Sequence, residues 1–136
     1  MPLDRDLRLD VPSLDAEHAL QIGLVEALGR AVEEGKSREV ADEILEKLLD
    51  YTRVHFLAEE LMMRMEGYPA YEAHHAEHGE LLAELQKLRA AYEGGALPMT
   101  HVAVAGLRSW LAGHVRTQDR AFANFLASKA AGRSSV

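Results

Sequence analysis

Hydrophobic residues recur every three or four positions along most of this chain, and glycine and proline separate the runs. That spacing matches one face of an α-helix, whereas the alternation that is typical of β-strands is missing. The pattern predicts four helices, at about residues 14–34, 37–66, 70–92 and 99–130. Residues 1–13 lack this period and contain two prolines, so we expect them to form an irregular N-terminal arm.

Three breaks separate the predicted helices, and each contains residues that end helices well. Glycine adopts the left-handed conformation that follows many helices, and proline cannot continue one. The breaks lie at Gly35, at Gly67 with Pro69, and between Gly94 and Pro98. Because such short connections force consecutive helices to run in opposite directions, we expect an all-α fold, an antiparallel up-down-up-down four-helix bundle. We interpret residues 1–136 as a single domain.

The inward stripe of every predicted helix contains histidine or a carboxylate where an apolar residue is expected. These positions are His18 in the first helix, His55 and Glu59 in the second, His74 and His78 in the third, and His114 and Asp119 in the fourth. Residues four positions apart share a helical face. Counting from the turns at 1.5 Å per residue brings all seven to heights that agree within about 4–5 Å. We therefore expect the seven side chains to meet in one layer of the bundle.

Histidine and carboxylate side chains gathered in a bundle core indicate a metal site. One such pair alone is more often an ordinary surface or core feature, but burial of seven polar groups without partners costs several kcal/mol for each. An ordinary zinc site takes about four ligands, so seven suit two metals that share bridging carboxylates. Imidazole suits zinc, copper, iron and nickel, whereas bridging carboxylates favour iron or manganese. None of the inward histidines has a glutamate three places before it, as the Glu-x-x-His motifs of ferritin-like di-iron enzymes require, which disfavours that type of site.

Asp119 is the one member of the set whose spacing does not fit a regular helix. It lies five residues after His114, and at about 100° per residue the two would point about 140° apart. A π-bulge between them would turn both inward, and such bulges often mark functional sites. We therefore predict a π-bulge within residues 114–119. Glu60, His75 and His101 lie off the inward stripes and are expected to face solvent.

The composition narrows the classes of partner. There are 15 basic and 22 acidic residues, a net charge of −7, and no basic run, so we expect neither nucleic acid nor a membrane as a partner. The sequence contains no cysteine, which excludes thiolate metal sites and disulfides. No apolar run approaches the roughly 20 residues of a membrane span, and the N-terminal segment lacks the apolar core of a signal peptide. We expect a cytoplasmic protein.

The spacing of the seven positions resembles that of the hemerythrins, and more closely that of the single-domain bacteriohemerythrins. The family pattern is a lone histidine on the first helix, followed by HxxxE, HxxxH and HxxxxD. The corresponding segments here are LDAEH, HFLAE, HHAEH and HVRTQD, and Trp110 lies four residues before His114. The resemblance extends from about residue 14 to residue 125 and includes EELMMRMEGYPAYEAH between the second and third motifs.

The resemblance implies a non-haem di-iron protein that binds O₂ reversibly, for carriage, storage or oxygen sensing, and that is not an enzyme. One iron ion would be held by His74, His78 and His114. The other would be held by His18 and His55, which leaves a coordination position open for O₂. Glu59 and Asp119 would bridge the two ions together with an oxo or hydroxo group.

An apolar wall is expected to exclude water from the open position and to slow autoxidation. The candidates for this O₂ pocket are Ile22, Phe56, Trp110 and Leu111, each of which also suits ordinary core packing. The alternative function is a di-iron enzyme, or a redox- or NO-responsive sensor, that uses the same site. An enzyme would need a nearby proton donor, for which Tyr51 and Gln21 are the candidates. A sensor would pass its signal to a protein partner.

Overall fold

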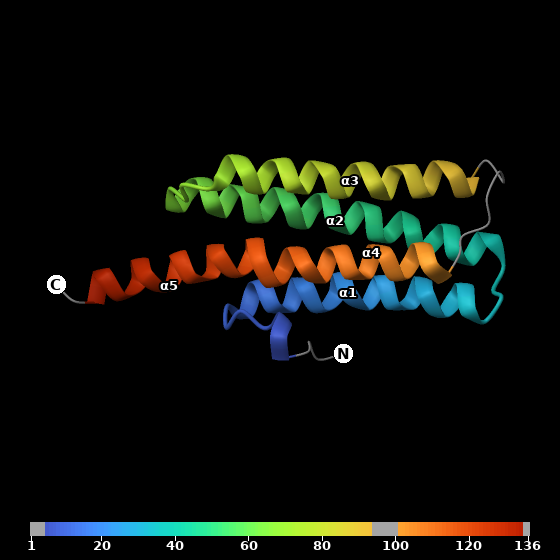
Figure 1. Cartoon of the computed structure of the whole chain (residues 1–136), viewed down its shortest axis with the longest axis horizontal. Helices are drawn as coiled ribbons and strands as arrows, with labels where there is room; N and C mark the ends of the chain where they lie inside the picture. Colours follow the sequence, from blue (N-terminus) through green and yellow to red (C-terminus); the bar gives the residue numbers. More distant parts are fainter. Residues whose placement is uncertain (1–4, 94–100, 135–136) are drawn as a thin grey trace.

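The computed structural model describes residues 5–93 and 101–134 (Figure 1). Its elements are a 3-10 turn η1 (Arg5–Leu7), α1 (Pro12–Glu33), α2 (Arg38–Glu66), α3 (Tyr71–Glu93), α4 (His101–His114), a π-helical segment η2 (Val115–Asp119) and α5 (Arg120–Ser134). Because α4, η2 and α5 follow one another without a break, they form one long rod (Figure 1). The described residues contain no strand, and the predicted all-α antiparallel four-helix bundle is confirmed.

The turns use the residues that the sequence singled out. Gly35 and Gly67 both have a positive φ, 65° and 68°, which a side chain would strain. Ser37 caps α2, because its Oγ accepts a hydrogen bond from the backbone N–H of Val40. The third expected break, between Gly94 and Pro98, lies outside the described residues. None of the described helices is long and apolar enough to cross a membrane.

The N-terminal arm is more ordered than its sequence suggested. It contains the turn η1, and both Leu7 and Leu9 are buried. Asp15 in the first turns of α1 accepts a hydrogen bond of 2.8 Å from the backbone N–H of Leu9. Arg120 of α5 donates to two carbonyl oxygens of the arm, at 2.8 and 3.1 Å. Burial of the leucines and these hydrogen bonds together hold the arm against the bundle.

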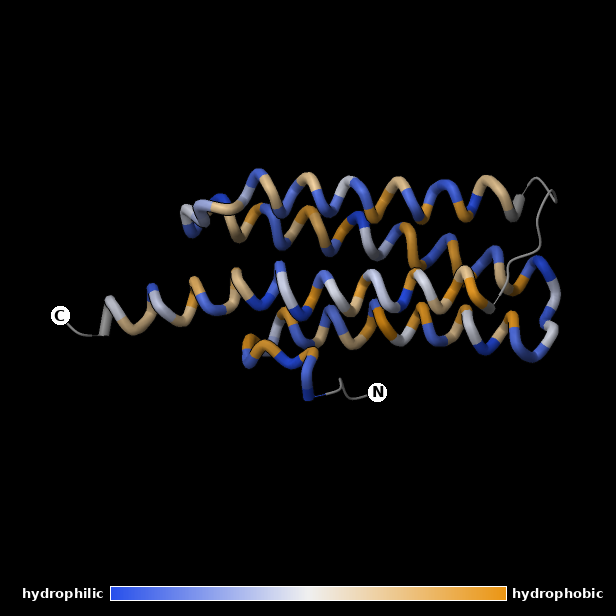
Figure 2. Tube along the Cα trace, in the orientation of Figure 1, coloured by the Kyte–Doolittle hydropathy of each residue, from blue (hydrophilic) through white to orange (hydrophobic). Residues whose placement is uncertain are grey.

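The interior of the bundle has two apolar clusters with a polar layer between them. Figure 2 shows that hydrophobic and hydrophilic positions follow one another along every helix. The larger cluster lies toward the α1–α2 turn and includes Ile22, Leu45, Phe56, Leu85 and Leu111. The smaller lies toward the α2–α3 turn and consists of Leu9, Leu14, Met63, Phe122 and Ala123. The polar residues predicted to bind metal lie on the helices between these two clusters.

Candidate metal centre

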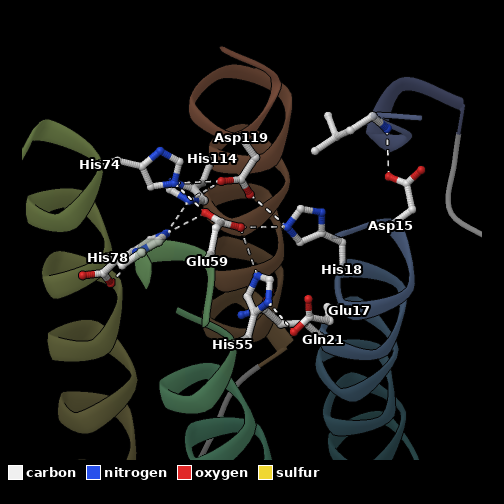
Figure 3. Close-up of polar contacts among 12 residues, drawn as sticks. Asp15, Glu17, His18, Gln21, His55, Glu59, His74, His78, His114 and Asp119 are labelled. Carbon is white, nitrogen blue, oxygen red and sulfur yellow. Dashed lines mark hydrogen bonds and ion pairs between the residues drawn. The ribbon is translucent and has the colours of Figure 1, made fainter. Parts of the chain in front are cut away.

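The structure brings all seven predicted residues together in one buried layer (Figure 3). They come from all four helices of the bundle. His18 lies on α1, His55 and Glu59 on α2, His74 and His78 on α3, and His114 and Asp119 on α4 and η2. Each of them is at most 2% exposed to solvent. The seven side chains therefore converge as predicted from their heights along the helices. They do so where water cannot form hydrogen bonds with them.

The two carboxylates divide the imidazoles into two groups. Glu59 Oε1 lies 2.7 Å from His74 Nε2 and 3.4 Å from His78 Nε2, on the α3 side. Its other oxygen, Oε2, lies 3.7 Å from His18 Nε2 and 3.5 Å from His55 Nε2, on the α1–α2 side. One carboxylate thus directs one oxygen toward each group, which is the arrangement of a bridging ligand.

Asp119 repeats this arrangement from the opposite rod. Its Oδ1 lies 2.8 Å from His74 Nε2 and 3.2 Å from His114 Nε2, and its Oδ2 lies 3.0 Å from His18 Nε2. Two sets of donor atoms, each confined to within 4.8 Å, could hold a cation. One set is Glu59, His74, His78, His114 and Asp119, and the other is His18, His55 and Glu59. Glu59 belongs to both.

Most donor atoms of the site lie close together without forming ordinary hydrogen bonds. Among the described residues, both oxygens of Glu59 and the Nε2 atoms of His18, His55 and His74 are buried without a hydrogen-bond partner. Several of these atoms are nevertheless within 3.7 Å of one another, because they point at common positions rather than at each other. Buried polar atoms of this kind are rare unless another group satisfies them. A pair of metal ions fits this donor set.

The π-bulge predicted between His114 and Asp119 is confirmed. Val115–Asp119 is π-helical and joins α4 to α5 without interrupting the rod. The wider turn brings Asp119 onto the face that carries His114, and both side chains are buried. Val115 is also fully buried in this segment, so the bulge positions an apolar residue beside the site as well.

Glu60 was expected to face solvent, and that expectation is wrong. Its side chain is only 11% exposed, and its Oε2 lies 2.9 Å from His78 Nδ1. The other oxygen of Glu60 contacts His75, whose side chain is 59% exposed, as expected for that histidine. Glu60 was missed because a helical wheel treats it as the neighbour of an inward residue, whereas α3 lies alongside α2 and covers it. The prediction that His101 faces solvent concerns a side chain outside those that the structure describes.

Two further glutamates contact imidazoles from outside the site, and the sequence argument did not single them out. Glu77 Oε1 lies 2.7 Å from His114 Nδ1. Glu17 Oε1 lies 3.3 Å from His55 Nδ1. The available signal was position, since Glu17, Glu60 and Glu77 each stand next to one of the seven residues in the chain.

Two of the four apolar residues expected around the site stack on its imidazoles, and the other two are buried in the larger apolar cluster. Phe56 is buried and stacks on His78, with ring centroids 3.7 Å apart. Trp110 stacks on His114, with centroids 5.7 Å apart. Ile22 and Leu111 are buried in the larger apolar cluster. Trp110 also lines a groove of about 700 Å³ between α3 and α4, together with Leu81, Leu88 and Leu107.

Without metal, the site holds protons. Burial by itself lowers the pKa of His18, but the close, negatively charged carboxylates of Asp119 and Glu59 outweigh burial and raise that pKa to about 9. The same balance raises the pKa of His74 to about 9. For His55, burial outweighs the nearby carboxylates and lowers the pKa. Burial raises the pKa of Asp119, yet its three imidazole neighbours reverse this and lower it well below its usual range.

The fold and the site define a class: four-helix-bundle proteins with a buried site for two cations that share carboxylates. The family model described as the hemerythrin HHE cation binding domain matches residues 9–126, so the chain belongs to the hemerythrin family. Hemerythrins are di-iron proteins that bind O₂, and the comparisons support the same cofactor and function for this chain.

Proteins that this chain is similar to include bacteriohemerythrins and a solved hemerythrin. The bacteriohemerythrin of Ralstonia nicotianae is 30% identical over 125 residues, which cover 90% of this chain and 86% of that protein. The bacteriohemerythrin of Methylococcus capsulatus is 28% identical over 108 residues, 79% of this chain and 82% of that protein. A crystal structure of wild-type hemerythrin has a TM-score of 0.79 at 27% identity, and the match covers 84% of this chain and 87% of that one.

Proposed function

We propose that this chain binds O₂ reversibly at two iron ions held by the seven buried residues. His74, His78 and His114 hold one ion, and His18 and His55 hold the other. Glu59 and Asp119 bridge the two. The observation that carries this assignment is that each carboxylate directs one oxygen to each histidine group, as its distances to His74 and His18 show.

The unequal division of imidazoles supports an O₂ position at the His18 and His55 side. With three imidazoles on one ion and two on the other, the second ion has fewer protein ligands and room for an added one. When bound, the iron pair supplies the electrons that reversible O₂ binding requires. Ile22, Phe56 and Leu111, the proposed apolar wall of this position, are all at most 6% exposed, which supports their role in excluding water.

An enzyme or a redox-responsive sensor on the same site is less well supported. Of the two candidate proton donors, Tyr51 directs its O–H to the backbone carbonyl of Glu17, at 3.3 Å. Gln21 is buried and donates to Thr52 Oγ1 at 3.1 Å. Both donors are thus engaged with protein atoms. Carriage, storage and sensing all use the same O₂ chemistry, and sensing additionally requires a protein partner. The cytoplasmic location stays a prediction from the sequence.

The test is metal content together with the optical spectrum. The protein is reduced without air, exposed to O₂, and then returned to an O₂-free atmosphere. We expect two iron ions per chain and an absorption band that appears with O₂ and disappears when O₂ is removed. Irreversible conversion to the oxidised form would favour the enzyme or redox-sensor alternative. Far fewer than two metal ions per folded chain would overturn the assignment of the seven ligands.

A further inference from the structure

Three glutamates around the site share one arrangement, in which each contacts a histidine on the helix that comes next in the chain. Each is the chain neighbour of a proposed ligand, and each contacts the outer nitrogen, Nδ1, of a histidine on the next helix. Glu17 of α1 contacts His55 of α2, Glu60 of α2 contacts His78 of α3, and Glu77 of α3 contacts His114 of α4. The distances are 3.3, 2.9 and 2.7 Å respectively.

Helix geometry explains why chain neighbours serve in this way. Consecutive residues on a helix point about 100° apart, so the neighbour of an inward ligand points toward the seam with an adjacent helix. His78, for example, directs its Nε2 toward Glu59 in the centre, while Glu77 reaches across to His114 on α4. A carboxylate on Nδ1 fixes the proton there and leaves Nε2 free to bind metal. The Nε2 atoms of His78 and His114 are indeed the ones that face inward, 3.1 Å apart.

The arrangement of glutamates stops at the seam between the last rod and α1. The residue that follows Asp119 is Arg120, which has no acceptor atom and donates instead to the carbonyl oxygens of Asp6 and Arg8 in the arm. Among the described residues, the Nδ1 atoms of His18, His55 and His74 have no hydrogen-bond partner, although that of His55 lies 3.3 Å from Glu17 Oε1. His18 and His74, one in each imidazole group, are therefore the two histidines of the site whose outer nitrogen no glutamate contacts among the described residues.

We propose that Glu17, Glu60 and Glu77 are positioning residues that hold three of the five imidazoles, those of His55, His78 and His114. This rests on the proposed function, because it assigns the histidines to two ions. Glu60 and Glu77 act on the three-histidine ion, and Glu17 acts on the two-histidine ion. The side chains of Glu60, Glu77 and Glu17 are 11%, 27% and 34% exposed, respectively. Solvent therefore weakens the interaction of Glu17 with its imidazole most.

The test is a titration of metal-free protein with Co²⁺, whose absorption reports ligand geometry and binding. Glu60→Leu and Glu77→Leu are each expected to weaken one of the two bound equivalents about 10–100-fold and to leave the other unchanged. Glu17→Leu is expected to weaken the other equivalent, by less. Glu60→Gln and Glu77→Gln keep an acceptor without the charge and are expected to restore part of the affinity, since charged hydrogen bonds are about twice as strong.

The matched control is Glu80→Leu, which removes an exposed glutamate one turn after Glu77 on the same helix. A second readout is NMR of the metal-free protein, in which the Nδ1–H protons of His78 and His114 are expected to exchange slowly. Each leucine variant is expected to lose its protected proton while its melting curve stays unchanged. That result would show that the glutamate positions the imidazole and does not merely stabilise the fold. The inference is overturned if both the cobalt affinities and the protected protons match those of Glu80→Leu.

Failure of the proposed function gives a different result. If the wild-type protein binds fewer than two cobalt ions, the dinuclear assignment is wrong, and with it the claim that the glutamates act on separate ions. The NMR measurement then still decides whether the three glutamates hold the imidazoles.

Discussion

The two halves of the metal centre use the same residue types but are enclosed differently. The half on α3 and α4 has three imidazoles, and two of them carry both a close glutamate and a stacked aromatic ring, as Phe56 on His78 and Trp110 on His114 illustrate. The half on α1 and α2 has two imidazoles, and only His55 carries both kinds of contact: a stacked ring, Tyr51, with centroids 6.3 Å apart, and a glutamate that is more distant and more exposed. The first half therefore surrounds its imidazoles with closer contacts than the second half does.

Removing a bridge should affect both halves and have the largest effect. Glu59→Ala deletes the one residue that belongs to both candidate cation sets, so we expect metal content to fall from two ions per chain to below one. Atomic absorption on purified protein measures this. Glu80→Ala, on the exposed side of α3, is the control and should keep two ions. A Glu59→Ala variant that retains two ions would show that this carboxylate does not bridge.

Removing a stacked ring should distinguish the halves. Phe56 is 2% exposed and lies directly on His78. We expect Phe56→Ala to lower the free energy of unfolding by about 3–5 kcal/mol, as is typical when a buried phenylalanine leaves a cavity. Chemical denaturation measures the loss. Because the ring lies closer to His78, at 3.7 Å, than to His55, at 5.7 Å, we also expect dissociation to accelerate more for the metal on the three-histidine side. Equal acceleration at both metals would contradict the division described above.

The pH dependence of the metal-free protein should reveal the protons that occupy the site. The pKa of His18 and of His74 is raised from 6.5 to about 9, so the stability they contribute is fully present below pH 6.5 and is lost as pH rises through 9. The pKa of Asp119 is lowered, so its contribution is lost only in acid. We therefore expect the melting temperature of the metal-free protein to fall between pH 6.5 and 9.

Bound metal should reverse that trend. Metal ions require neutral imidazoles, so binding releases the protons and metal affinity increases with pH over the same range. Calorimetric titration of the metal-free protein in buffers of different ionisation enthalpy counts the protons released. A metal-free melting temperature that rises from pH 6.5 to 9 would mean that the carboxylates do not hold the protons on His18 and His74.

A change far from the metal centre should leave metal binding in both halves unchanged. Ser37 caps α2 at the far end of the bundle from the site. We expect Ser37→Ala to lower the free energy of unfolding by about 1 kcal/mol, because one backbone N–H loses its partner. Two ions per chain and an unchanged optical spectrum should accompany this loss. Altered metal binding in this variant would show that global stability, rather than local contacts, sets the affinity.

Much of the site followed from the sequence, and the reason is helical regularity. Once the helices and short turns are predicted, the rise per residue places His18, His55 and His74 at one height, and the period places them on inward faces. Even the irregular element was predictable, since the five-residue interval between His114 and Asp119 is incompatible with a regular helix that buries both. Local periodicity is enough wherever a residue points directly at the bundle axis.

The glutamates show where that reasoning stops. Glu60 lies 100° from an inward residue, and a sequence alone does not say whether that direction meets solvent or a neighbouring helix. The same is true of Leu7 and Leu9 in the N-terminal arm. They are buried because Asp15 and Arg120 hold the arm against the bundle. By itself the sequence determined the helices, the seven inward residues and the bulge. Which side chains at the seams support them is visible in the folded protein alone, because it depends on how closely adjacent helices pack.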